Sequence, residues 1–174
     1  YGRVLKPLTQ KAKTVFGIDS SLANIKAAHK YLSRCDNIQL YTMNAVELAF
    51  KKNSFDKVIC IQNGVSAFHV DPEKLMDESL RVAKKDGLIL FSSYSDKFWE
   101  NRLEWFKIQS EYKLLGEIDW EQTKNGVIIC KDRFHATTFS PQDFKKLMSK
   151  FDLSYNIEEV DNSSIFCIID LREC

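Results

Sequence analysis

Asp19 is the residue whose position most directly indicates chemistry. It ends a short apolar run at 14–18, and Ser20 and Ser21 follow it at the start of a helix-like segment. A parallel strand that ends at a nucleotide site has this order, because the strand is buried and the carboxylate at its tip can accept hydrogen bonds from both hydroxyls of a ribose. The pattern therefore predicts a nucleotide-binding site. The alternative is that Asp19 only caps the following helix.

Other chemically capable side chains follow later strands. His69 is the candidate general base, since imidazole is the side chain that most often accepts a proton near neutral pH; the alternative is that it packs against or caps the next helix. Tyr94 and Trp99 are candidates for the substrate pocket, where the faces of aromatic rings can contact a cation, or else they belong to the core. His135 could face the same site or lie on the surface.

These residues require elements that bring strand ends together. We predict strands at 14–19, 37–43, 55–61 and 88–92, with apolar residues on both faces of the third, as in a central parallel strand. Helices are predicted at 22–33 and from Pro72, with Asp71 as the N-cap and a stop at 84–87, where Gly87 follows cations. This alternation indicates an α/β fold with a parallel sheet.

The pattern changes after residue 93. An aromatic-rich helix is predicted at 96–115, and small antiparallel strands at 117–121, 127–131 and 133–138, with Asn125-Gly126 as a hairpin turn. A helix capped by Ser140 should run to about residue 150. Strands at 152–159 and 164–171 then pair around Asp161-Asn162. We expect the insert at 94–139 to be a substrate lid or a homodimer contact.

Composition limits the classes of partner. The chain has 174 residues, with 25 basic and 24 acidic side chains and a net charge of +1, so charge indicates neither a nucleic acid nor an anionic membrane as partner. No apolar run approaches the roughly 20 residues of a membrane span. The five cysteines include no CxxC pair, so neither a disulfide framework nor a metal site is indicated, and a cytoplasmic setting is expected. Residues 1–174 are expected to form a single domain.

Four motifs occur in an order that resembles the class I S-adenosylmethionine-dependent methyltransferases. Gly2 resembles the last glycine of the family's glycine-rich loop, and 17–21 its second-strand motif. Asn44-Ala45 resembles its Asp-Ala pair, and the stretch 53–87 is similar to small-molecule methyltransferases. The resemblance implies a Rossmann-like, mainly parallel sheet with a terminal antiparallel pair. Most of the glycine-rich loop and the fold's first strand are expected to precede residue 1.

The same resemblance implies the cofactor and the residues that bind it. S-adenosylmethionine would be the methyl donor and a small molecule the acceptor. The family's Asn/Asp-Pro-Pro-Tyr signature is absent, with Gln62-Asn63-Gly64-Val65 in its place, which argues against methylation of planar amines. The expected cofactor-binding residues are Gly2, Asp19, Ser20, Asn44, Ala45 and Gln62.

Two other classes of function remain open from the sequence. An NAD-dependent dehydrogenase shares the acid at the second strand tip, although the stretch 53–87 and the terminal antiparallel pair disfavour it. A methyltransferase-like protein that binds the cofactor without catalysis is also compatible, because methyl transfer from a sulfonium needs no obligatory base.

Overall fold

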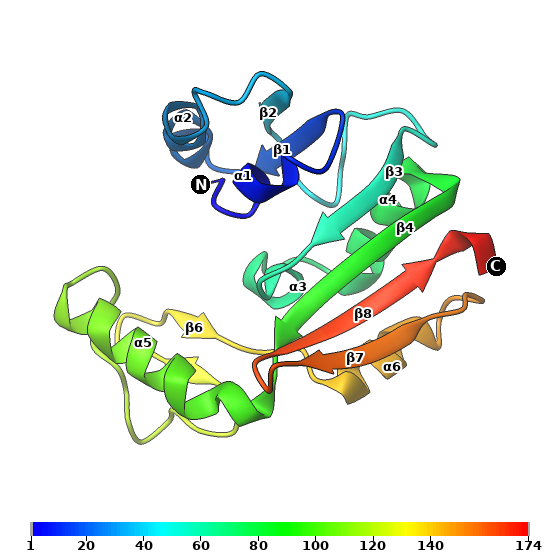
Figure 1. Ribbon diagram of the computed structural model, residues 1–174. Coiled ribbons are helices and arrows are strands. Elements are labelled where there is room, and N and C mark those ends of the chain that lie inside the picture. Colours follow the sequence, from blue (N-terminus) through cyan, green and yellow to red (C-terminus); the bar gives the residue numbers. More distant parts are fainter. Residues whose placement is uncertain (1, 174) are drawn as a thin grey trace. The chain divides into compact units, whose positions relative to one another are not determined.

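The computed structural model describes residues 2–173, which form two compact units (Figure 1). The first unit ends at Phe50 and the second begins at Lys51. The sites expected from the sequence are divided between them, so each unit is described by itself.

The first unit is a pair of parallel strands with a helix between them. It contains α1 (Leu5–Leu8), β1 (Val15–Asp19), α2 (Leu22–Tyr31) and β2 (Ile38–Thr42). The strands pair from Val15 opposite Ile38 to Asp19 opposite Thr42. Helix α2 buries Ile25 and Ala28, which share one face of the helix, as the spacing predicts. The two predicted strands and the helix are confirmed, with ends one or two residues shorter.

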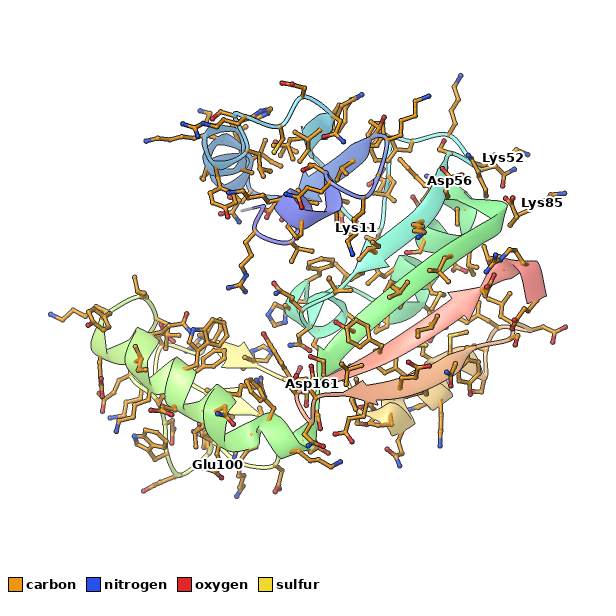
Figure 2. All side chains as sticks on the ribbon, viewed as in Figure 1. Lys11, Lys52, Asp56, Lys85, Glu100 and Asp161 are labelled. Carbon is orange, nitrogen blue, oxygen red and sulfur yellow. The ribbon has the colours of Figure 1, made fainter. Side chains whose placement is uncertain are left out.

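The second unit is built on a four-stranded sheet in the order β3-β4-β8-β7. The strands are β3 (Phe55–Cys60), β4 (Ala83–Tyr94), β7 (Asn156–Val160) and β8 (Ser164–Asp170). Strands β3 and β4 are parallel, whereas β8 runs antiparallel to both β4 and β7. The pairing of β7 with β8 confirms the predicted terminal pair, although β7 begins at Asn156 rather than at residue 152. Asp161, labelled in Figure 2, and Asn162 have positive φ in the turn between the two strands.

Helices α4 (Pro72–Val82) and α6 (Pro141–Met148) follow from local capping signals and buried faces, whereas the short helix α3 (Gly64–Ala67) has no side-chain cap at Asn63. Asp71 accepts a hydrogen bond from the Glu73 amide at 2.9 Å, and Pro72 occupies the first turn of α4. Ser140 and Asp143 form a complete capping box at α6. Both helices bury apolar faces, with Met76 of α4 and Phe144 of α6 fully inaccessible to solvent.

The predicted stop of α4 at 84–87 is wrong. The helix ends at Val82, because the carbonyls of Arg81 and Val82 accept hydrogen bonds from the amides of Asn53 and Ser54. Strand β4 then starts at once, with Ala83 opposite Phe55. Residues 84–87 form a bulge opposite Asp56, closed by the ion pair of Lys84 with Asp56 at 2.6 Å. Gly87 has no positive φ and is not a helix cap.

Strand β3 also differs from the expected central strand. Within residues 2–173 it pairs on one side, with β4, and so forms an edge of this sheet. Its faces are also only partly covered, and Ile59 is 38% exposed. The fully buried centre of the sheet lies instead on β4 and β8, where Ile89, Phe91, Cys167 and Ile169 are inaccessible.

The insert after β4 has a small core of its own. It contains the 3₁₀ turn Asp96–Phe98, α5 (Trp99–Glu111), β5 (Ile128–Ile129) and β6 (His135–Ala136). Its strands are shorter than predicted, and the stretch 117–121 contributes a single bridge, from Ile118 to Cys130. The Asn125-Gly126 hairpin turn is confirmed, with both residues at positive φ. The core consists of Phe106, Ile118, Ile128 and Cys130, with Trp99, Leu103, Leu115 and Ala136 packed against it.

Two general features of residues 2–173 bear on function. None of the helices among them has both the length and the apolar character to cross a bilayer. The cysteines in this part of the chain, Cys35, Cys60, Cys130 and Cys167, are free thiols. Burial raises the pKa of the Cys60 thiol to about 12, so this side chain behaves as a small hydrophobe.

Candidate functional site

In the first unit, Asp19 ends β1 and its carboxylate is held in place by the start of α2. Oδ1 accepts a hydrogen bond from the Ser21 amide at 2.8 Å, and Oδ2 accepts one from the Asn24 side chain at 3.1 Å. The N-cap of α2 is Ser21, whose hydroxyl accepts from the Asn24 amide. Asp19 is therefore not the cap, and Ser20 lies exposed between the two. Each carboxylate oxygen retains a second lone pair for another donor.

Asn44 lies at the same end of the two-stranded sheet as Asp19. The Met43 amide donates to the Asp19 carbonyl at 3.1 Å, so the chain leaves β2 beside the end of β1. The Asn44 side-chain oxygen accepts from the Val46 amide at 3.2 Å, which closes a turn around Ala45. The predicted pair of strand-end polar residues is therefore close in space within this unit.

Gly2 occupies a position that only glycine fills without strain. Its φ is +91°, and a Cβ at this position would lie 2.7 Å from Leu32 Cδ1. Its carbonyl accepts from the Lys6 amide, which leads the chain into α1. This conformation agrees with a glycine at the end of a tight loop.

In the second unit, the chain leaves β3 through two strained residues. Gln62 and Asn63 have φ values of 57° and 64°, and neither is glycine. Such conformations cost of order 1 kcal/mol each and concentrate at functional sites. Ser92 on β4 holds both residues, since its hydroxyl accepts from the Gln62 amide at 2.9 Å and its carbonyl accepts from the Asn63 amide at 3.0 Å.

Asn63 ties this strand end to the insert. The side chain is buried and donates to the Thr137 carbonyl at 2.8 Å, and its oxygen accepts from the Ser93 hydroxyl at 2.8 Å. The Ser93 hydroxyl in turn accepts from the Phe139 amide. The returning strand of the insert is thus fixed beside the end of β3. Sequence reasoning missed this role of Asn63, although an asparagine before glycine at a strand end is a recognisable turn signal.

A cavity of about 180 Å³ lies where these segments meet. It gathers four of the predicted site residues, Gln62, His69, Tyr94 and His135. The rings of His69 and His135 are 4.9 Å apart, and His69 has a positive φ of 51°. Trp99 does not line this cavity; it lines a neighbouring cavity of about 430 Å³ together with Ser95, Asp96 and Asn125-Gly126. Trp99 also packs on the insert core, the alternative weighed for it.

Arg102 of α5 is a residue that sequence reasoning missed, and it lines both cavities. Its side chain is only 2% exposed, and Nη1 donates to the Gly126 carbonyl at 2.6 Å. Burial lowers the pKa of this guanidinium, while the nearby Tyr94 opposes that shift. No local signal distinguishes Arg102 from other charged residues of the helix, because its burial comes from the fold of the insert.

Comparison with known families decides the class of protein. The family model described as a methyltransferase domain matches residues 1–91, just over half of the chain. This chain belongs to the methyltransferase domain family. The predicted class I S-adenosylmethionine-dependent methyltransferase is thereby confirmed, with S-adenosylmethionine as its cofactor. Comparison with curated protein sequences gives no significant match.

Solved structures agree on the fold of this methyltransferase. It is similar to the PH0226 protein from Pyrococcus horikoshii OT3, with 20% identity over 97% of this chain and 76% of that one and a TM-score of 0.68. A SAM-dependent methyltransferase from Methanosarcina mazei has 18% identity over 97% and 85%, with a TM-score of 0.65. The N-methyltransferase NodS from Bradyrhizobium japonicum WM9, in complex with S-adenosyl-L-homocysteine, has 12% identity over 97% and 72%, with a TM-score of 0.59. The predicted α/β fold is confirmed.

Proposed function

We propose that this protein transfers the methyl group of S-adenosylmethionine to a small-molecule acceptor bound beside the end of β3. The observation that carries the proposal is the cavity of about 180 Å³ that joins Gln62, His69, Tyr94 and His135. It lies where Gln62 and Asn63 adopt strained backbone conformations. Pockets with a few convergent polar groups on a rigid scaffold are the usual sites of small-molecule chemistry.

The side chains of the first unit suit the nucleoside part of the cofactor. Asp19 offers two oxygens that each accept one further hydrogen bond, which matches the adjacent hydroxyls of a ribose. The Asn44 oxygen can accept from the adenine amino group in addition to the Val46 amide. The Ala45 amide is the proposed donor to an adenine ring nitrogen. Gly2, Ser20 and the backbone of Gln62 complete the proposed cofactor-binding set.

The methyl group of S-adenosylmethionine is already activated by the positive sulfonium. The protein therefore needs mainly to hold the acceptor at attack distance and to exclude water. His69 is the proposed base for an acceptor that must lose a proton, and contact with the His135 ring restricts its orientation. The aromatic rings of Tyr94 and Trp99 are proposed to line the acceptor side.

The insert at 94–139 is proposed to act as the lid over this acceptor. Its helix α5 and strand β6 supply Phe106 and His135 to the cavity wall. The insert also exposes Tyr112, Leu114 and Trp120, so a homodimer contact remains the other proposed use of the same segment. The free thiols support the proposed cytoplasmic location, because a reducing compartment keeps cysteines unpaired.

A screen with a methyl-labelled donor tests the proposed function. The full chain is incubated with labelled S-adenosylmethionine and a panel of small amines, alcohols and acids, and both labelled products and S-adenosylhomocysteine are measured. Turnover that falls at least tenfold in His69→Ala supports this site. Tight cofactor binding without turnover of any acceptor would instead identify a binding protein without catalysis.

A further inference from the structure

Arg102 is a buried cation with an unused hydrogen-bonding edge. Nη1 bonds to the Gly126 carbonyl, but Nε and Nη2 have no hydrogen-bond partner anywhere in residues 2–173. Buried polar groups are nearly always paired in native proteins, and a buried charge without a partner is costly. The two unpaired nitrogens of Arg102 therefore point to a bound ligand that accepts hydrogen bonds from them.

Within residues 2–173, no carboxylate forms an ion pair or hydrogen bond with Arg102. The rings of Tyr94, Trp99 and Phe106 lie 5.8, 5.9 and 5.6 Å from its central carbon. These rings attract the cation through their faces and exclude water from it, but they do not accept hydrogen bonds in the plane of the guanidinium. The local environment thus strengthens any hydrogen bond that an anion makes with the free edge.

Arg102 forms part of the wall of both cavities, so a molecule bound in either cavity lies beside its side chain. It is the one lysine or arginine among the described residues that line either cavity, and Asp96 lines the larger one. A single cation matches a ligand with one negative charge. A phosphate dianion would need further cations, and Asp96 would oppose its two charges more strongly than the single charge of a carboxylate.

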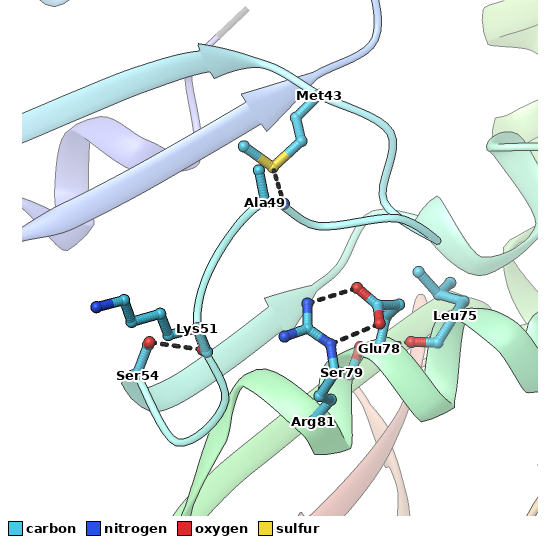
Figure 3. A network of polar contacts seen from close by, with 8 residues as sticks. All are labelled: Met43, Ala49, Lys51, Ser54, Leu75, Glu78, Ser79 and Arg81. Carbon is cyan, nitrogen blue, oxygen red and sulfur yellow. Dashed lines mark hydrogen bonds and ion pairs between the residues drawn. The ribbon is translucent and has the colours of Figure 1, made fainter.

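The geometry of the free edge matches a planar carboxylate. Arg81 uses the same two nitrogens to bind Glu78, with Nε to Oε1 at 2.7 Å and Nη2 to Oε2 at 2.8 Å, as Figure 3 shows. Such bidentate pairs combine charge with two parallel hydrogen bonds. We propose that the methyl acceptor carries a carboxylate, and that Nε and Nη2 of Arg102 bind it. The statement that the ligand is the methyl acceptor rests on the proposed function. The statement that Arg102 binds a carboxylate does not depend on the proposed function.

The first test measures the anion site without any cofactor. Benzoate and benzamide are titrated into the full chain, with binding followed by calorimetry, because the pair differs mainly in the carboxylate. Wild type should bind benzoate at least tenfold more tightly than benzamide, and Arg102→Lys should weaken benzoate binding by about 10- to 100-fold. Lysine keeps the positive charge but loses the two-nitrogen edge, so Arg102→Lys tests the edge itself, and urea unfolding of the variant checks that it folds.

Matched controls separate the proposal from a purely structural role of Arg102. Arg81→Met, which removes an arginine that binds a carboxylate through the same two nitrogens, should keep the full preference for benzoate. Equal affinity of wild type for benzoate and benzamide, or unchanged benzoate affinity in Arg102→Lys, would overturn the proposal. Inorganic phosphate that binds more tightly than benzoate would overturn the assignment to a carboxylate.

The second test asks whether the anion site serves the methyl acceptor. Acceptor candidates are offered with labelled S-adenosylmethionine in pairs, as the free acid and as its carboxamide, and only the acid should be methylated. In Arg102→Lys, KM for the acid should rise about 10- to 100-fold. Methylation of acid and amide at equal rates would overturn the inference while leaving the proposed function intact. Benzoate binding without methylation of any pair would refute the proposed function and leave the carboxylate site standing.

Discussion

Replacing Asp19 should affect cofactor binding and stability by amounts that can be separated. In Asp19→Ala the ribose loses a charged acceptor, which should weaken S-adenosylmethionine binding by about 1.5–3 kcal/mol, or roughly 10- to 150-fold. The same change removes the acceptors of the Ser21 amide and the Asn24 side chain. Two partly exposed hydrogen bonds contribute about 1–3 kcal/mol together, so the free energy of unfolding should fall by that amount.

Two further variants assign these losses to their causes. Asn24→Ala removes one of the two local bonds but leaves the carboxylate, so it should lower stability by about 0.5–1.5 kcal/mol and leave cofactor affinity unchanged. Asp19→Asn keeps an oxygen for the Ser21 amide but presents an amide donor where the ribose also donates. It should therefore lose affinity while retaining most of the stability.

The measurements are calorimetric titration with S-adenosylmethionine and urea unfolding of each variant, with titrations kept well below the unfolding temperature. Wild-type affinity in Asp19→Ala would refute the ribose assignment. Loss of affinity in Asn24→Ala that parallels its loss of stability would show that Asp19 acts only by holding the start of α2.

Three further predictions concern the second unit. Ser140→Ala should lower the free energy of unfolding in urea by about 1 kcal/mol, because it removes the hydroxyl of the capping box at α6. Phe144→Ala should cost about 3–5 kcal/mol in the same assay, since this ring is fully buried. Hydrogen bonds from Arg172 lower the pKa of Asp170 from 3.8 to about 2. Because this pKa is lower in the folded state, the stabilisation is present above about pH 4 and is lost as the pH falls towards 2, and acid titration of Asp170→Asn should lack this loss.

Local signals in the sequence predicted much of the fold correctly. Asn125-Gly126 forms the predicted hairpin turn because both residues tolerate positive φ. Ser140 begins its helix because Asp143 completes a reciprocal pair of hydrogen bonds. In each of these cases the residues that determine the structure lie within a few positions of one another, so the sequence displays the cause directly.

The errors arose where distant segments decide the outcome. Lys84 to Gly87 resembles a helix stop, yet the amides of Asn53 and Ser54 cap α4 earlier and Phe55 pairs with Ala83. Figure 2 labels Asp56 and Lys85 at this end of the sheet. Pairing between strands far apart in the sequence thus overrides the local glycine signal.

The candidate site was predictable in part for the same reason. Four residues could be predicted as site residues because each was expected to follow or face the end of a strand. All four line one cavity: Gln62, His69, Tyr94 and His135. Arg102 could not be selected, because its burial depends on how α5 packs within the insert and on the turn that supplies the Gly126 carbonyl. The sequence of a polar helix does not show which of its charged residues will be buried.

The central claim is that this chain is a methyltransferase that uses S-adenosylmethionine. Its most direct test is calorimetric titration of the full chain with S-adenosylmethionine and, separately, with NAD. We expect saturable binding of S-adenosylmethionine with one site per chain and no measurable heat with NAD. Saturable binding of NAD with none of S-adenosylmethionine would contradict it.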